Sequence, residues 1–313
     1  MSTLQSTSRR LLLAKLETTY GTDAVPDASA NAILLKSLTV TPAAATSLKR
    51  DLIKPYFGNN GTILTDTYVK VEAEVELSGS GTAGTAPAWD PLLQACGFAA
   101  VITANTSVVY APISTGIKSA TLYFYNDGAL HQVTGAYGDV EFMLQAKQIP
   151  TLKFTMTGLY ADPSAAALPA NTAFTDQAVP VVPAEGVTTV NSVGGYAAAI
   201  LEKLDLKLGN KVEFRNMPGS QYVMLVDREP SGSIDIQSMT PDVHDFFGTA
   251  NRTLQGEIAL THGTAAGNIV GLSMPNCFLL NPNYADSQGV QMLSIPFDPT
   301  PVSGNDELTL TLT

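Results

Sequence analysis

Residues 68–77 read Tyr-Val-Lys-Val-Glu-Ala-Glu-Val-Glu-Leu, and this stretch decides the fold class of the 313-residue chain. Apolar side chains occupy every second position and alternate with Lys70, Glu72, Glu74 and Glu76. Because successive side chains of a β-strand point to opposite faces, this period of two predicts a strand with one buried and one solvated face. Such strands are typical of antiparallel sheets.

Other segments repeat this alternation and predict further strands at 34–40, 152–159, 204–208, 233–237 and 308–312. Helix signals are few. Residues 90–98 and 240–248 each begin with a polar capping residue and a proline, continue with an apolar turn and end at a glycine. The sequence therefore predicts an all-β protein with two short helices.

The two helix signals belong to a possible duplication of the whole element order. Residues 35–40 can be laid over 201–206, and in both places a long loop (41–66 and 209–230), a strand, a helix and a final pair of strands follow. Within the final pair of strands, we match residues 138–144 with residues 289–293. The segment between the halves is rich in Ala, Pro, Thr and Val, which suits a linker. We predict an N-terminal arm (1–33), a first domain (34–160), a linker (161–197) and a second domain (198–313).

Composition limits the function. The chain carries 17 Lys and Arg against 28 Asp and Glu, a net charge of −11. This argues against a protein that grips nucleic-acid phosphates, because such binding needs basic side chains to release counterions. The apolar run at 11–14 is too short for a secretion signal. With no candidate membrane span and only two distant cysteines, Cys96 and Cys277, we expect a soluble protein made in a reducing cytoplasm.

Residues 79–84 form a literal Gly-x-Gly-x-x-Gly motif, Gly-Ser-Gly-Thr-Ala-Gly. A dinucleotide-binding strand is buried on both faces, whereas the strand before this motif has a charged face. The motif is therefore interpreted as a loop. His131, His244 and His262 lack the spacing of metal ligands. The sequence predicts no catalytic residue, no metal site and no cofactor.

Glu72, Glu74 and Glu76 are the strongest candidates for chemistry. Neighbours in this row lie about 6.6–7 Å apart on one face of the strand, a spacing that fits the two carboxylates of an inverting glycosidase. However, catalytic carboxylates normally face each other across a cleft, so a solvated acidic face is the preferred interpretation. A hydrolase acting on polysaccharide remains an alternative.

The opening of the chain carries a family resemblance. Residues 9–23 read Arg-Arg-Leu-Leu-Leu-Ala-Lys-Leu-Glu-Thr-Thr-Tyr-Gly-Thr-Asp, and Asn-Ala-Ile follows at 31–33. Together with Leu-Lys-Arg-Asp at 48–51, the 69–77 strand and Trp-Asp-Pro-Leu-Leu at 89–93, they resemble tail tube proteins of long-tailed bacteriophages. The resemblance covers roughly the first 100 residues well and the rest by pattern.

The resemblance implies a β-sandwich or barrel-like domain with one flanking helix, in a virion tail protein made in the host cytoplasm. The family has one such domain per chain, and the duplication predicts that this chain departs from it by holding two in tandem. Such domains form stacked rings, six to a ring, around a hollow lumen. Two domains per chain predict homotrimeric rings with pseudo-sixfold symmetry; six chains per ring is the alternative. DNA and a tape measure protein would occupy the lumen without sequence-specific binding. Another β-sandwich virion protein, such as a tail terminator or adhesion module, also remains open.

Two surfaces are predicted within this assembly. The lumen would be lined by Lys70, Glu72, Glu74, Glu76 and Asp235. The long loops mix charged and aromatic residues, a composition suited to interfaces. The residues predicted to contact the next ring are Lys49, Arg50, Asp51, Lys54, Tyr56 and Arg215.

Overall fold

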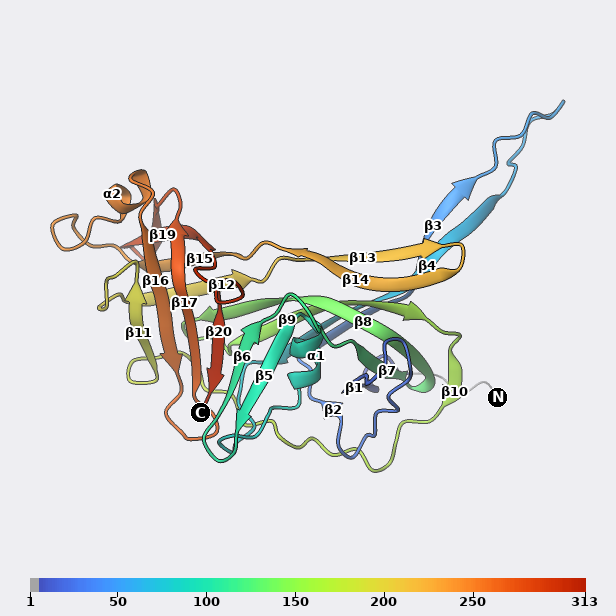
Figure 1. Cartoon of the computed structure of the whole chain (residues 1–313), viewed down its shortest axis with the longest axis horizontal. Coiled ribbons are helices and arrows are strands. Elements are labelled where there is room, and N and C mark those ends of the chain that lie inside the picture. The colour runs from blue at the N-terminus through green and yellow to red at the C-terminus, as the bar shows by residue number, and fades with distance from the viewer. Residues whose placement is uncertain (1–5) are drawn as a thin grey trace.

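The charged strand predicted first is β4 (Thr62–Glu76), which lies inside a sheet (Figure 1). The computed structural model describes residues 6–313 and confirms the all-β class. Strand β4 is antiparallel to β3 (Ser37–Lys49) on one side and to β9 (Thr151–Tyr160) on the other. Its side chains at 69, 71, 73 and 75 are buried, as the alternation predicts.

This sheet continues from the first half of the chain into the second. Strand β9 pairs with β8, and β8 pairs with β12, the first sheet strand after residue 198. The antiparallel order is β3-β4-β9-β8-β12-β15-β19-β18, which we call the joint sheet. Its remaining strands are β8 (Gly128–Gln145), β12 (Leu201–Lys207), β15 (Ser231–Gln237), β18 (Asn283–Ser287) and β19 (Val290–Pro299).

A second layer also contains strands from both halves, in the order β5-β6-β20-β17-β16-β11. These strands are β5 (Phe98–Thr103), β6 (Ser107–Pro112), β11 (Thr188–Val193), β16 (Gln255–His262), β17 (Val270–Leu279) and β20 (Thr309–Leu312). The first part of β8 also pairs with β10 and β7, and β7 leads on to β1 and β2. They are β1 (Arg10–Leu16), β2 (Ala32–Ile33), β7 (Ala120–Asn126) and β10 (Ser164–Ala166).

One hydrophobic cluster runs through both halves between these layers. It includes Trp89 and Leu92 from the first half together with Ile295 and Phe297 from the second. The indole Nε1 of Trp89 donates a hydrogen bond to the Ser78 carbonyl at 3.1 Å, so the buried ring keeps its polar atom satisfied. Helix α1 (Asp90–Ala95) follows Trp89 and is largely buried.

The second helix begins later than the sequence predicts. Residues 240–243 form a turn, and α2 spans Phe246–Asn251. Asp245 is its N-cap, and its carboxylate accepts a hydrogen bond from the Gly248 amide. The sequence predicts a helix start at Pro241 because a capping residue, a proline and an apolar residue also occur there, about one turn before the helix begins. No helix among residues 6–313 has the length and hydropathy that a membrane crossing requires.

The two predicted long loops are β-hairpins, and that prediction was wrong. Strands β3 and β4 continue far beyond the sheet, leaving only residues 50–61 between them. Residues 209–230 contain β13 (Asn210–Met217) and β14 (Ser220–Arg228). We call residues 47–64 the first hairpin and β13–β14 the second hairpin. The first hairpin is exposed on most sides, so its sequence lacks the alternation that marks a half-buried strand. Strand β13 does alternate, with half-buried Val212 and Phe214 between exposed Lys211, Glu213 and Arg215.

The glycines of the Gly-x-Gly-x-x-Gly motif join the halves by close backbone approach. A Cβ atom on Gly79 would collide with the Gly267 carbonyl oxygen, and the Gly81 amide donates to that same oxygen at 3.0 Å. Within the predicted linker, β10 and β11 each add a strand to the sheets. The domain boundaries themselves stay a prediction.

The pairing pattern relates the two halves strand by strand. Strand β3 corresponds to β12, and β4 corresponds to β15. In each half these two strands pair with each other, a helix follows, and a later strand returns to pair with the second of them. Strand β9 pairs with β4 and β19 pairs with β15, so β19 corresponds to β9. The predicted match of residues 289–293 with residues 138–144 was therefore wrong by one strand. By the same pairing, β17 and β18 together correspond to β8.

Candidate functional site

The polar face of the joint sheet carries the predicted lumen residues. Residues directly opposite each other in antiparallel strands share a face. Lys70, Glu72, Glu74 and Glu76 of β4 therefore lie on one face, and successive partners across β9, β8 and β12 extend that face into the second half. Asp235 lies opposite Lys203 on the same face. The structure thus places all five residues on one surface.

Lysines lie among these carboxylates. Along one row of the sheet, Glu74, Lys153, Glu141 and Lys207 stand opposite one another on four successive strands. Lys153 Nζ is 3.7 Å from Glu72 Oε2, Lys207 Nζ is 3.2 Å from Glu141 Oε1, and Lys36 Nζ is 2.8 Å from Glu74 Oε1. The alternation of sign lets each charge meet an opposite one.

The face is therefore almost neutral. Over residues 70–76 of β4 and across β9, β8, β12 and β15, with Lys36 beside Glu74, it holds seven carboxylates and five lysines, a net charge of −2 for this part of the face: Glu72, Glu74, Glu76, Asp139, Glu141, Asp205 and Asp235 against Lys36, Lys70, Lys153, Lys203 and Lys207. Sequence reasoning found Lys70 and the acidic row of β4 and missed the other four lysines. The same alternation marks Lys203, Asp205 and Lys207 in β12, but nothing local in the sequence reveals that β12 lies two strands from β9.

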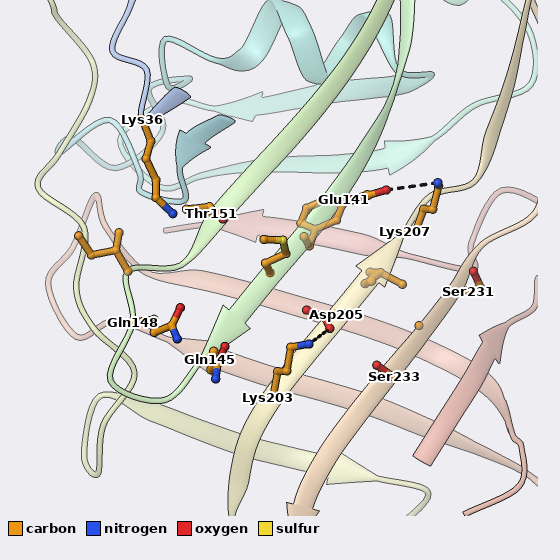
Figure 2. Close-up of a pocket in the computed structure, with 15 residues that line it drawn as sticks. Lys36, Glu141, Gln145, Gln148, Thr151, Lys203, Asp205, Lys207, Ser231 and Ser233 are labelled. Atoms are coloured by element: carbon orange, nitrogen blue, oxygen red, sulfur yellow. Dashed lines mark ion pairs between the residues drawn. The ribbon is translucent and has the colours of Figure 1, made fainter. Parts of the chain in front are cut away.

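A groove of about 540 Å³ runs along this face where β8 meets β12 (Figure 2). Figure 2 shows Lys203 reaching Asp205 along β12 and Lys207 reaching Glu141 across the joint. Its described lining holds Phe142 but no Trp or Tyr on which a sugar could stack. The groove is a concave polar wall rather than an enclosed cavity.

The protonation of the face also argues against acid catalysis. Burial raises the pKa of Glu74, but hydrogen bonds from Lys36 and Ser37 and the lysine charge outweigh it and hold that pKa below its usual value. A general acid needs the opposite shift. Burial does raise the pKa of Asp139, yet this carboxylate accepts a hydrogen bond from the Asn210 amide at 2.9 Å, at the root of the second hairpin.

The predicted ring-contact residues separate into two groups. Lys49, Arg50, Asp51, Lys54 and Tyr56 lie on the first hairpin, which projects away from the body at the upper right of Figure 1. Lys54 Nζ is 5.7 Å from the centre of the Tyr56 ring.

Arg215 is exposed on the second hairpin, which runs back across the first half of the chain. Its neighbour Phe214 stacks on Tyr68 of β4, with ring centres 5.1 Å apart. Sequence reasoning placed both hairpins in one role, whereas the structure shows one docked and one free.

Residues 7–313 match a family model described as phage tail tube protein. No curated protein matches the chain.

Proposed function

The chain belongs to the phage tail tube protein family, and on that premise we propose that its copies join edge to edge into three-chain rings. The rings stack into the hollow tube through which DNA passes, and the protein has no catalytic role. The observation that carries the proposal is the joint sheet, which contains equivalent strands from both halves and ends in two unpaired edges, β3 and β18.

Unpaired edges present rows of backbone donors and acceptors that pair readily with another strand. Strand β3 pairs only with β4, and β18 pairs only with β19, among residues 6–313. Because the two edges are different surfaces, they would join head to tail, the geometry that generates rings. Each chain supplies two equivalent units, so three chains complete six units.

The joint inside the chain serves as a template for the joint between chains. There, β8 pairs with β12 and places Gln145 opposite Lys203. Strand β18 corresponds to the end of β8, and β3 corresponds to β12. The same register would therefore place Ala285 of one copy opposite Thr39 of the next copy, and Asp286 opposite Leu38. The Leu38 carbonyl accepts a hydrogen bond from the Arg10 guanidinium at 2.9 Å. This register would therefore place the Asp286 carboxylate of one copy near the Arg10 guanidinium of the next.

The polar face would then line the lumen. Four of the five lysines on this face lie within 4.0 Å of a carboxylate, so they offer DNA phosphates little opportunity for counterion release. Beyond about 8 Å, each remaining charge is screened at physiological salt. This arrangement suits the sliding of DNA, and of a tape measure protein, without retention.

Cysteine cross-linking tests the register and the number of chains. Both native cysteines are buried, so engineered pairs report the joint. Assembled T39C/A285C protein should oxidise to a covalent species that ends at three chains on a non-reducing gel. The matched control, T41C/A285C, is displaced by two residues, about 6.6–7 Å along the strand, and should stay uncrosslinked.

The outcomes separate the alternatives. A ladder that ends at six chains would replace the three-chain ring with a six-chain ring. Assembly without the T39C/A285C bond would reject the register. Electron micrographs of concentrated wild-type protein that show isolated rings would favour a tail terminator, and monomers alone would reject self-assembly.

A further inference from the structure

We propose that the first hairpin docks over helix α2 of the neighbouring copy in the same ring, as the second hairpin docks over α1 within one chain. This inference rests on the proposed self-assembly and names a surface that assembly would use. It assigns the first hairpin to a contact within the ring rather than between rings.

The second hairpin shows how such docking works. It lies across the first half (Figure 1). The Tyr20 hydroxyl holds it at its middle. That hydroxyl accepts a hydrogen bond from the Val223 amide at 2.6 Å and donates to the Val223 carbonyl at 3.2 Å. The Leu225 side chain packs against Gly97, which follows α1, and the Asn210 side-chain amide donates to the Cys96 carbonyl at 2.6 Å.

The equivalent position in the second half is uncovered. Four residues of α1 are buried, whereas Phe246 is the buried residue of α2. The turn after α1 continues into the buried Phe98, but the turn after α2 continues into the exposed Leu254. Phe247 and Tyr284, whose ring centres lie 5.2 Å apart, are exposed beside it. We call these exposed apolar residues the α2 patch: Val243, Phe247, Leu254, Tyr284 and Val290.

The first hairpin carries a matching apolar surface. Ile53 and Phe57 at its tip are fully exposed. Leu48 and Ile63 lie opposite each other on its strands, as Phe214 and Val223 do on the second hairpin. Its other exposed apolar residues are Leu52, Tyr56 and Leu64. So many exposed apolar side chains on one projection mark an interaction site.

Charge and direction favour the same partner. The first hairpin holds Lys49, Arg50 and Lys54 against Asp51. Near the α2 patch, Asp242 and Asp245 precede α2, Arg252 follows it, and Asp286 lies two residues after Tyr284 in β18. The joint between β8 and β12 carries the second hairpin from the second half onto the first. If β3 joined β18 of a neighbouring copy with the same geometry, the first hairpin would lie over the second half of that neighbouring copy.

Cross-links distinguish docking within a ring from docking between rings. We expect L48C/F247C and I63C/L254C proteins, oxidised after assembly, to form covalent species that end at the number of chains in one ring. Contacts between rings would instead link chains along the tube and extend the ladder past that number. The control L48C/V101C pairs the hairpin with a residue of β5 that is more exposed than Phe247 or Leu254, and it should stay uncrosslinked.

Each result decides the matter. Tubes that form normally while neither cysteine pair links would reject the docking and leave the tube function standing. Ladders longer than one ring would assign the hairpin to the next ring. If wild-type protein forms neither rings nor tubes, the failure belongs to the proposed function itself.

Discussion

The ion pair between Arg228 and Glu307 gives a sharp test of how the second hairpin is anchored. Arg228 ends β14, and Glu307 lies just before β20 with only 3 % of its surface exposed. Arg228 Nε and Nη2 each lie 2.6 Å from Glu307 Oε1, and Nη1 donates to the Ile113 carbonyl at 3.1 Å. The pair therefore ties the hairpin root to both halves of the chain.

The structure sets the expected size of the effect. Glu307 Oε2 is buried and accepts no hydrogen bond from the described residues, so Arg228 alone compensates this carboxylate. R228M would leave a buried uncompensated charge, which costs about 3–5 kcal/mol of unfolding free energy. E307L should cost less, because Arg228 keeps its bonds to Ile113 and Asn305. The double variant R228M/E307L should lie within about 1 kcal/mol of the wild type, because apolar residues can replace a buried ion pair at little cost.

Urea unfolding of the unassembled protein measures all four members of this cycle. Comparable slopes would show that the midpoints report stability. The double variant should be more stable than R228M alone, so the coupling between the two positions is large. A double variant that loses the full sum of the two single losses would refute the reasoning, because it would show that the residues act independently.

Three further predictions concern other parts of the molecule. G79A should lower the unfolding free energy by about 1–3 kcal/mol through overpacking against the facing backbone, whereas G58A, with open space around it, should change it by less than about 0.5 kcal/mol in the same urea assay. Burial lowers the pKa of His262, so the unfolded chain binds the proton more readily; the melting temperature should therefore fall as pH drops below 6.5, and a pH profile unchanged in H262Q would contradict this. E72K/E76K would raise the net charge of the polar face by four units per chain, so phage carrying it should build intact tubes that eject DNA more slowly at low salt, and unchanged ejection kinetics would count against a lumen position.

The strands of the sheets could be predicted where their two faces differ in burial. The period of two at 69–75 and in β12 and β15 is a direct record of one buried and one solvated face. Strand β13 carries the same contrast at residues 211–215, although residues 209–230 were predicted to be a loop. The first hairpin could not be predicted in this way, since a strand exposed on both faces has no such contrast. Pro42 and the alanines at 43–45 read as a loop for that reason.

The candidate surface was predicted in part for a related reason. The carboxylates of β4 stand on one strand and are visible locally, whereas their neutralisation depends on which strands become neighbours. Lys153 lies opposite Glu74 only because β9 returns beside β4, and Lys207 meets Glu141 across the joint between the halves. Pairings over such sequence separations are set by the tertiary fold, so the predicted acidic wall is in the structure a nearly neutral one.

The joint between β8 and β12 explains why a chain with two equivalent units would be advantageous for a ring. Every association between separate molecules costs translational and rotational freedom. The joint between β8 and β12 forms when the protein folds, with its register fixed by Leu204 opposite Leu144 and Leu206 opposite Phe142 in the core. In the proposed ring, every second joint would therefore already exist before the chains associate. Three associations would then close a six-unit ring in place of six. The same covalent joint frees the second half to differ from the first, and the excess acidity of residues 161–313 and the uncovered α2 patch are differences of that kind.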